Sequence, residues 1–479
     1  MLSFLVFFPL LGLLLVWFSP ENPGNTRSLR LGLFFTIITL WISLILWGSF
    51  DNSLEKGQWI EEITCNNFFS IRLLVDGISI YFILLTTFIF PIALLSNWEN
   101  LGNRSAKSYV IVMLLLESLL LFVFTVSDLL LFYIFFESIL PPLFLLIGIY
   151  GSLQRIRASY HLFLYTFLGS LFMLLSILGI YFITGTTDWI YLRDIVIDPE
   201  IQKVFWLGIF LALAIKTPLV PFHLWLPLAH AESPLGGSVI LAGIVLKLSL
   251  YGVLRILLPL LPEASLYFTP LVYTICVITI IYSSLTTLRQ VDLKVIIAYS
   301  SIGHMALAIL GAFSNNLQGL AGSLLLSLAH GLVSPALFIC VGGVLYDRTH
   351  TRILSYYRGL ASYMPLFSLF FFIFSLCNIA VPFSGNFLGE FLILSGSFQR
   401  MPLLTLLASS SVVLSAAYGV WLYIRIIGGS YSSYFSVLPD LSFRELCLLI
   451  PLLVITLLLG IQPHWVFSSL FTSLTTLLY

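Results

Sequence analysis

The sequence predicts an all-α polytopic membrane protein with about fourteen transmembrane helices, two inverted five-helix repeats, and broken helices 7 and 12. Composition is the first reason, because 59% of the 479 residues are hydrophobic, 9% are charged and the mean hydropathy is +1.07. Water-soluble globular domains do not have this composition. The second reason is a series of apolar runs of membrane-spanning length, and the third is the interruption of two of them by proline.

The apolar runs give the expected helices and their order. A helix needs roughly 20 apolar residues to cross the hydrocarbon core of a bilayer. The first run follows no basic segment and precedes no small-residue cleavage site, so we expect a retained spanning helix rather than a signal or transit peptide. Runs of suitable length fall near residues 2–19, 30–49, 77–97, 109–126, 128–150, 160–184, 203–227, 236–258, 268–287, 294–313, 317–345, 363–397, 402–427 and 443–460.

Two runs are interrupted, the seventh at Pro218 and Pro221 and the twelfth near Pro382. Proline has no N–H group, so it exposes backbone carbonyls inside the membrane. The two broken helices are an odd number of spans apart and therefore cross in opposite senses, which is typical of inverted-repeat transporters. We expect helices 1–3 in residues 1–108, a first repeat (helices 4–8) in 109–258, a second repeat (helices 9–13) in 259–428, and helix 14 in 429–479.

Basic residues gather on one side of the predicted helices. Of the 21 lysines and arginines, 13 lie in odd-numbered connections and six in even-numbered ones, and the remaining two are Lys216 and Lys247. By the positive-inside rule, both termini then face away from the compartment in which the protein is made.

Composition and motifs exclude several functions. The net charge is zero, which argues against a nucleic-acid partner. The five cysteines are scattered and contain no CxxC pair, and the sequence has neither a Walker loop nor a GxGxxG motif after a strand. We therefore expect no metal, iron–sulfur cluster or nucleotide cofactor in this chain.

Ionisable residues within the apolar runs are the candidate functional residues. A charge at membrane depth is costly and commonly marks an ion or proton pathway. Lysine–glutamate pairs alter each other's proton affinity, and histidine exchanges protons near neutral pH, so the set favours proton movement over solute binding. The six residues are Glu137, Lys216, Lys247, His304, His330 and Glu390.

Plainer interpretations exist for most of these residues. Either glutamate could be a structural carboxylate, Lys216 could extend toward water from a helix end, and the histidines could be satisfied core residues. Lys247 leaves least room for this, because it lies in the middle of the run 236–258. Weaker candidates, for access paths, are Glu117, Asp128, His223, His230 and Glu232.

Four stretches together resemble a known family. They are FFESILPP, KTPLVPFHLWLPLAHAESPLGGSVILAGIVLKLSLYG, LRQVDLKVIIAYSSIGHM and GNFLGEFLIL. In this order and spacing they are similar to the antiporter-like proton-channel subunits of respiratory complex I, and the resemblance covers nearly the whole chain.

The resemblance implies a proton-translocating membrane-arm subunit of NADH:ubiquinone oxidoreductase in the mitochondrial inner membrane, with both termini toward the intermembrane space. It implies that Glu137 and Lys216 are a modulating ion pair, Lys247 the central proton carrier, His304 and His330 relays, and Glu390 the distal exit residue. Partners would be other membrane-arm subunits, including neighbouring antiporter-like subunits, and membrane lipids. NADH, FMN, iron–sulfur clusters and ubiquinone would bind in partner subunits.

Two positions depart from the family pattern. Many relatives have a carboxylate where this chain has Leu228, and a glycine often follows the proline of helix 12 where this chain has Phe383. Two alternatives stay open, namely a subunit of an Mrp-type cation/proton antiporter and a structural spacer with a silent channel. Copurifying partners would identify the first alternative, and a dry, discontinuous charged axis would favour the second.

Overall fold

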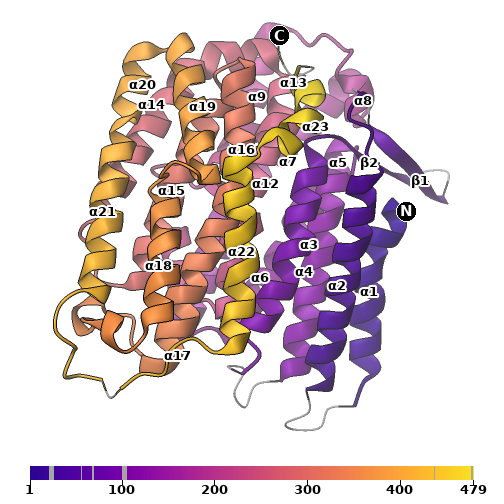
Figure 1. Cartoon of the computed structure of the whole chain (residues 1–479). Helices are drawn as coiled ribbons and strands as arrows, with labels where there is room; N and C mark the ends of the chain where they lie inside the picture. The colour runs from indigo at the N-terminus through magenta and orange to yellow at the C-terminus, as the bar shows by residue number, and fades with distance from the viewer. Residues whose placement is uncertain are drawn as a thin grey trace.

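The computed structural model describes residues 1–20, 26–54, 57–66, 69–99, 105–435, 437–475 and 478. Glu55, Lys56 and Arg104, which enter the charge count above, lie outside the described residues. The described chain is a bundle of helices that run side by side, with one β-hairpin projecting from the N-terminal part (Figure 1).

The elements follow the order of the expected spans. The N-terminal part contains α1 (Leu2–Phe18), α2 (Arg27–Gly48), β1 (Gln58–Asn66), β2 (Phe69–Val75) and α3 (Ser79–Ser96). The next part contains α4 (Ala106–Thr125), α5 (Leu129–Ser138), α6 (Leu140–Tyr150), α7 (Arg155–Thr184), α8 (Trp189–Leu192), α9 (Pro199–Lys216), α10 (Trp225–Glu232), α11 (Leu235–Ile240), the π-helix η1 (Leu241–Val245), α12 (Leu246–Gly252), the π-helix η2 (Val253–Leu257) and α13 (Leu258–Leu260). The last part contains α14 (Pro262–Thr287), α15 (Leu293–Ala312), α16 (Leu317–Phe338), the π-helix η3 (Ile339–Leu345), α17 (Tyr346–Thr349), the 3₁₀ turns η4 (Leu354–Tyr356) and η5 (Leu360–Ser362), α18 (Pro365–Asn378), α19 (Gly385–Arg400), α20 (Pro402–Ala408), α21 (Ser410–Ile427), α22 (Phe443–Ile461) and α23 (His464–Thr475).

Most of these elements have the length and composition of membrane spans. Within the described residues, 11 continuous helical segments are long and apolar enough to cross a membrane. The expected spans outside this set are α1, which has 17 residues, and the two interrupted runs, α9 with α10 and α18 with α19. The polytopic membrane fold is confirmed, and the count of about fourteen stays a prediction.

The expectation of an all-α chain is wrong at residues 58–66 and 69–75, which form two antiparallel strands. Contacts remote in the sequence hold them: Glu61 pairs with the N-terminal ammonium of Met1, and Arg72 of β2 pairs with Asp188 at the start of α8. Burial raises the pKa of Glu61, but hydrogen bonds from the N-terminus and Ser3 outweigh it and lower the value to about 2. Such partners cannot be deduced from a local pattern.

Proline and capping residues place the helix ends near the site. Lys216 is the last residue of α9, and helix resumes only at Trp225 in α10, so the break predicted at Pro218 and Pro221 is observed. The second predicted break separates α18 from α19, which begins after the capping residue Ser384. Both interruptions therefore place backbone that is not helical beside ionisable side chains.

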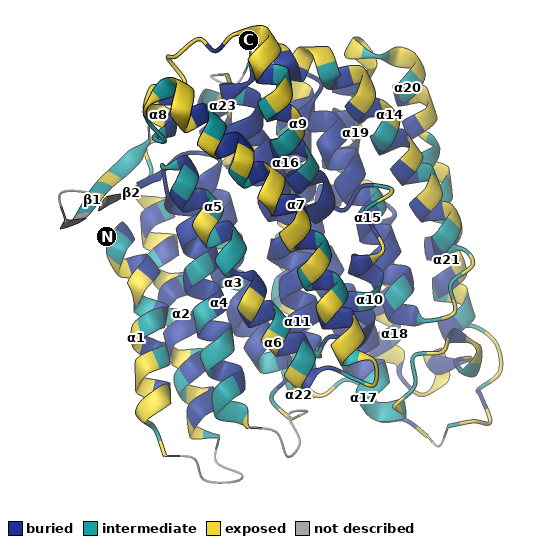
Figure 2. Cartoon of the chain, turned by 180° about the vertical axis from the view of Figure 1, so that it is seen from behind, coloured by how far each residue is buried: buried dark blue, intermediate teal, exposed yellow. Residues whose placement is uncertain are grey.

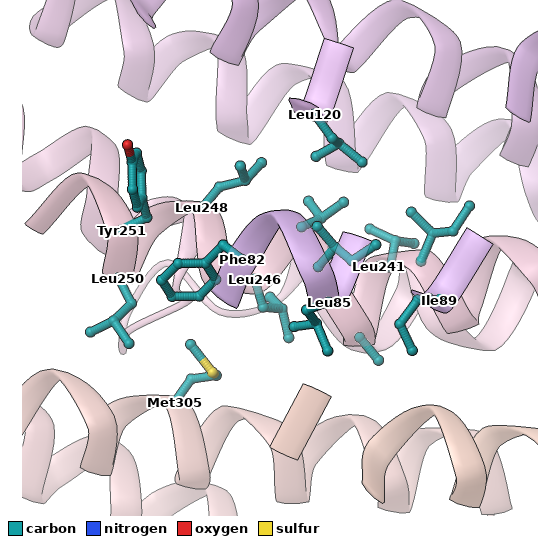
Figure 3. Packing of buried hydrophobic residues seen from close by; sticks show 14 of the residues in the cluster. Phe82, Leu85, Ile89, Leu120, Leu241, Leu246, Leu248, Leu250, Tyr251 and Met305 are labelled. Carbon is teal, nitrogen blue, oxygen red and sulfur yellow. The ribbon is translucent and has the colours of Figure 1, made fainter. Parts of the chain in front are cut away.

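The helical segment from α11 to α13 is almost completely buried. Leucines of this segment pack against Phe82, Leu85 and Ile89 of α3 on one side and Met305 of α15 on another (Figure 3). Exposed residues gather on the outer faces of α7, α20 and α21, where lipid or partner subunits would contact them (Figure 2). The segment that carries Lys247 is thus shielded on all sides by other helices of the chain.

Both ends of the chain lie at the hairpin end of the bundle. The N-terminal ammonium contacts Glu61 in β1, and Thr472 in α23 donates a hydrogen bond to the Asn52 carbonyl before the hairpin. The loop after α6 and helix α17 lie at the opposite end (Figure 1). This placement agrees with an even number of crossings.

Candidate functional site

Lys247 lies in the middle of the buried helix, between two π-helical segments. Its side chain is 0% exposed, and its Nζ donates to the Ala242 carbonyl in η1 and lies 3.0 Å from Nδ1 of His330. A π-helical turn changes the pairing of backbone groups and can free a carbonyl for another donor. The local geometry of η1 therefore provides an acceptor for the buried ammonium group of Lys247.

Two histidines and a glutamate continue from Lys247 across three helices. The rings of His330 in α16 and His304 in α15 have centroids 5.5 Å apart, and Nδ1 of His304 lies 2.9 Å from Oε1 of Glu390 in α19. Nε2 of each histidine is buried without a hydrogen-bond partner among the described residues. Four of the six predicted residues thus form one connected series, along which, in the described part of the chain, the two Nε2 atoms are the polar atoms left unpaired.

Close packing of α19 against α16 fixes this series. Gly389 immediately precedes Glu390, and a Cβ at Gly389 would lie 2.7 Å from the Cβ of Leu326 in α16. A Cβ at Gly385 would lie 2.9 Å from the Cβ of Ala329, next to His330. Any larger side chain at these glycines would push α19, and with it Glu390, away from the histidines.

Glu137 and Lys216 form a second group. Oε1 of Glu137 lies 3.7 Å from Nζ of Lys216, which also donates a 2.9 Å bond to the Phe136 carbonyl and lies 3.1 Å from the centroid of the Phe136 ring. Both side chains sit at helix ends, because α5 ends at Ser138 before Pro141 and α9 ends at Lys216 before Pro218. The end of α5 and the aromatic face together offset the cation.

The structure does not join the two groups by a direct bond. Lys216 and Lys247 have no hydrogen-bond partner in common within the described part of the chain. Their helices do touch, because a Cβ at Gly252 of α12 would lie 2.8 Å from Leu213 of α9. The lysines therefore lie on neighbouring helices, each about a turn or more from this contact.

A small cavity adjoins the far end of the series. It has a volume of about 20 Å³, enough for roughly one water molecule. His304 and Glu390 line it, together with hydroxyl side chains of the three helices α14, α15 and α21: Ser283, Ser284, Tyr299, Ser300, Ser411, Ser415 and Tyr418. Hydroxyl groups can both donate and accept hydrogen bonds, so this cavity can pass a proton to or from Glu390.

Two buried polar residues near the series were missed by sequence reasoning. Both side-chain atoms of Asn386, one helical turn before Glu390, are buried without a hydrogen-bond partner among the described residues. Lys294 in α15 is 4% exposed and donates to the Ser233 carbonyl, although the sequence places it at a loop end. Asn386 could have been found from its position four residues before Glu390, which places both on one face of a helix. Lys294 could have been found from the DLK pattern after a predicted loop.

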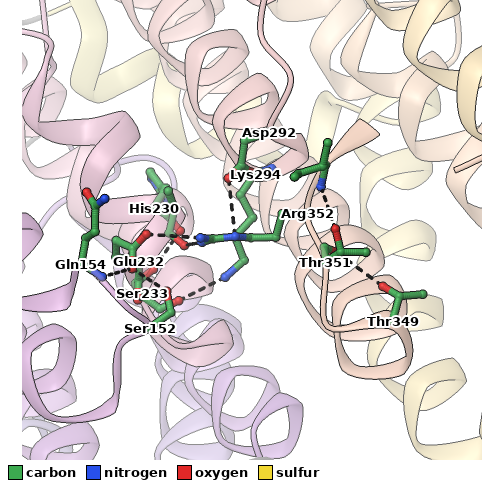
Figure 4. Close-up of polar contacts among 12 residues, drawn as sticks. Ser152, Gln154, His230, Glu232, Ser233, Asp292, Lys294, Thr349, Thr351 and Arg352 are labelled. Carbon is green, nitrogen blue, oxygen red and sulfur yellow. Dashed lines mark hydrogen bonds and ion pairs between the residues drawn. The ribbon is translucent and has the colours of Figure 1, made fainter. Parts of the chain in front are cut away.

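The weaker candidates Asp128 and Glu232 have structural partners. Asp128 caps α5 by accepting from the backbone N–H groups of Leu130 and Leu131. Glu232 accepts from Ser152, from the Gln154 backbone and from Arg352, which also lies 3.5 Å from Asp292 (Figure 4). Burial raises the pKa of Glu232, but these donors outweigh it and hold the value below its usual range.

The remaining weaker candidates are buried aromatic or acidic groups. His223 lies against the rings of Tyr282 and Tyr299, and His230 stacks on Phe338 with centroids 4.6 Å apart. Neither ring nitrogen of either histidine has a hydrogen-bond partner within the described residues. Glu117 lies in α4, and its hydrogen bond is to Thr39 of α2 rather than to a residue of either group.

The two departures from the family pattern lie at the breaks. Leu228 is a half-buried residue of α10 and supplies no charge there. Phe383 has φ 74°, in the left-handed region that favours glycine, and its side chain is 73% exposed. The break between α18 and α19 is therefore kept at a conformational cost rather than with the freedom that glycine would give.

Comparisons with known proteins agree with this geometry. Residues 126–415 match the family described as NADH:quinone oxidoreductase/Mrp antiporter, TM. The chain is 54% identical to NADH-ubiquinone oxidoreductase chain 4 of Mycosarcoma maydis, covering 100% of this chain and 99% of that protein. It is 49% identical to the protein of the same name from Arabidopsis thaliana, covering 99% and 96%.

Solved structures share the fold. A chain in the respiratory complex I of Thermus thermophilus with bound NADH superposes with a TM-score of 0.90 at 29% identity, covering 100% of both chains. A chain of the archaeal membrane-bound sulfane sulfur reductase superposes with a TM-score of 0.88 at 21% identity, which shows the fold alone. Because these similarities extend along the whole chain and agree with its helical membrane fold, the chain belongs to the NADH:quinone oxidoreductase/Mrp antiporter family and, within it, to the NADH-ubiquinone oxidoreductase chain 4 proteins.

Proposed function

We propose that this chain, a proton-translocating membrane subunit of complex I, moves protons along the two groups of buried residues described above. The observation that carries the proposal is the connected series from Lys247 through His330 and His304 to Glu390. Nζ of Lys247 lies 3.0 Å from Nδ1 of His330, the two imidazole centroids are 5.5 Å apart, and Nδ1 of His304 lies 2.9 Å from Oε1 of Glu390. The pair Glu137–Lys216 lies on the helices adjacent to it.

Each residue of the series has a defined chemical role. Protonated Lys247 can donate to Nδ1 of His330 when that nitrogen is unprotonated, and histidine can then release a proton from Nε2. A water at the two unpartnered Nε2 atoms would pass the proton to His304, whose Nδ1 faces Glu390. Glu390 would hand it to the hydroxyl-lined cavity beyond.

The pair Glu137–Lys216 would modulate this transfer. While the carboxylate stays close, it offsets the charge of Lys216, and the nearby Lys247 can keep its own proton. When the pair opens, the ammonium of Lys216 is less compensated and repels the charge on Lys247, which favours release toward His330. Energy from the redox reaction elsewhere in the complex would act on this pair.

The spacing of the two contacting pairs supports the inverted repeat. Glu137 and Lys216 lie in predicted spans five and seven, and His304 and Glu390 lie in spans ten and twelve, so both members are offset by the same five spans. We therefore propose repeats in residues 109–258 and 259–428, after N-terminal helices in 1–108 and before a C-terminal helix in 429–479.

Location and partners follow from membership of the complex. The chain is a multi-pass membrane protein that assembles with other complex I membrane-arm subunits. We place it in the mitochondrial inner membrane with both termini toward the intermembrane space, in contact with neighbouring antiporter-like subunits and lipids. NADH, FMN, iron–sulfur clusters and ubiquinone are assigned to partner subunits.

Replacing Glu390 tests the proposal. Glu390→Gln keeps the shape and a hydrogen bond to His304 but cannot carry a proton, so the protons pumped per NADH oxidised should fall while the complex assembles. Glu263→Gln is the control, because it makes the same substitution at an exposed glutamate in the first turn of α14, outside the series. The measurement is proton uptake into proteoliposomes during NADH oxidation. Parental pumping by the Glu390 variant would show that the series is not the path.

A further inference from the structure

Glu117 is a carboxyl group buried at membrane depth outside the proposed path. It lies in the middle of α4 and is 0% exposed. None of the ion pairs among the described residues includes it. An ionised carboxylate in such a place would be costly, and an intramembrane acid of this kind calls for a functional or structural role.

Its hydrogen bonding fits a neutral acid. Oγ1 of Thr39 in α2 lies 2.6 Å from Oε1 of Glu117 and 2.8 Å from the Thr36 carbonyl, while Oε2 of Glu117 has no partner among the described residues. A threonine hydroxyl has one proton, which a carbonyl can only accept. When Glu117 supplies its own proton, Glu117 donates to Thr39 and Thr39 donates to Thr36, so each contact has one donor. A carboxylate would instead have a single donor for both oxygens.

Hydroxyl groups lie around Glu117 on the neighbouring helices. The buried face of α2 carries Thr36, Thr39 and Ser43 at helical spacing, and Ser43 lies 2.7 Å from Oγ1 of Thr87 in α3. The helices are in close contact, because a Cβ at Gly32 of α2 would lie 2.6 Å from Val110 of α4. Hydroxyl contacts thus join α2 to α3 through Ser43 and to α4 through Thr39.

We infer that Glu117 is a proton-binding site outside the relay, which keeps its proton while the complex turns over and, as a neutral carboxylic acid, joins α4 to α2 through Thr39. The site binds a proton and no other ligand. It stands apart from the relay, because its hydrogen-bond partner is Thr39 of α2, whereas the relay begins with the contact between Lys247 and His330. Failure of the proposed path would leave this inference unaffected.

Infrared spectroscopy of the purified complex tests the inference. A neutral carboxylic acid gives a carbonyl band distinct from that of a carboxylate, so the wild-type spectrum minus that of Glu117→Gln should contain one such band. The band should be the same in the resting complex and in the complex turning over with NADH and quinone. Absence of the band would show an ionised Glu117, and a band that changes during turnover would place Glu117 in the relay. Either result overturns the inference.

Two variants of α2 test the hydrogen bond itself. Thr39→Val removes the acceptor of the Glu117 proton, so the band should persist but shift to the frequency of a less strongly hydrogen-bonded acid. Ser43→Ala is the control, because Ser43 contacts Thr87 and not Glu117, and it should leave the band in place. Equal spectra for wild type and Thr39→Val would show that Thr39 is not the partner, and this readout holds even if Glu117→Gln assembles poorly.

Discussion

The two buried lysines of the proposed path have different neighbours. Lys216 has a carboxylate, a backbone carbonyl and an aromatic face close to its ammonium group. Lys247 has a backbone carbonyl and a histidine, and no carboxylate in an ion pair among the described residues. Lys216 is thus suited to keep its proton as the cation of an ion pair, and Lys247 is suited to exchange its proton with His330.

Glu137 and Lys216 should behave as one unit when they are replaced. Removing either leaves a buried charge without its partner, at a cost of roughly 3–5 kcal/mol for a fully buried pair. The single variants Glu137→Gln and Lys216→Met should therefore each reduce pumping, and the double variant should lose less than the sum of the two. Proton pumping per NADH in the four members of this cycle is the measurement, and strictly additive losses would show that the two residues act independently.

Residue types at membrane depth could be predicted from the sequence, but most of their contacts could not. All six predicted residues are mostly or fully buried, and the relay needs helices far apart in the chain to bring His304 against Glu390. From the sequence, Lys294 is predicted to lie in a connection between two helices, yet in the fold it is buried and donates to the Ser233 carbonyl. Burial by other helices, which decides the role of such a residue, is invisible in a linear pattern.

The helix breaks are elements that local chemistry determines. Proline cannot continue the hydrogen-bond ladder, so the ends of α9 and α18 follow from Pro218, Pro221 and Pro382. The hairpin of β1 and β2 instead depends on Met1 and Asp188, and its position could not be deduced from its own residues. The local sequence thus predicts where these two helices end. Contacts with residues remote in the sequence determine that paired strands form between α2 and α3.

The strained residue at the second break predicts a stabilising substitution. Phe383 has φ 74°, which costs an L-amino acid about 1–2 kcal/mol, so Phe383→Gly should stabilise the subunit by about 1 kcal/mol after the entropy of glycine is counted. Val381→Gly, two residues earlier in the same break, should destabilise it by a similar amount, because that residue gains flexibility without relief of strain. The readout is the temperature at which the purified complex loses this subunit. A Phe383→Gly variant less stable than Val381→Gly would contradict the argument.

At the scale of the whole molecule, the positions of the chain ends and loops define the topology. Glu232, Ser152 and Arg352 meet at one end of the bundle, and Thr349 lies beside them (Figure 4). Asp188 and the hairpin lie at the opposite end, where both termini are found. Since basic residues favour the side of synthesis, the end with Ser152 should face the matrix.

Single cysteines should report this orientation. Ser152→Cys and Thr349→Cys should react with a membrane-impermeant maleimide from the matrix side, and Thr187→Cys should react from the intermembrane side, in a background without native cysteines. Sealed vesicles of known orientation are the sample. Labelling of the Thr187 variant on the same face as the Ser152 variant would overturn the topology. Labelling of the Thr349 variant opposite the Ser152 variant would break the even number of spans between them.

The central claim is that Lys247 carries protons through the middle of the chain, and Lys247→Ala tests it most directly. Ser249→Ala is the control, because Ser249 is equally buried in the same helix and bonds only to the Leu246 carbonyl among the described residues. The measurement is the number of protons pumped per NADH oxidised by the assembled complex in proteoliposomes. We predict a reduced ratio for Lys247→Ala and the parental ratio for Ser249→Ala, because alanine has no group that can hold a proton between η1 and His330. A Lys247→Ala complex that assembles and pumps at the parental ratio would contradict the account.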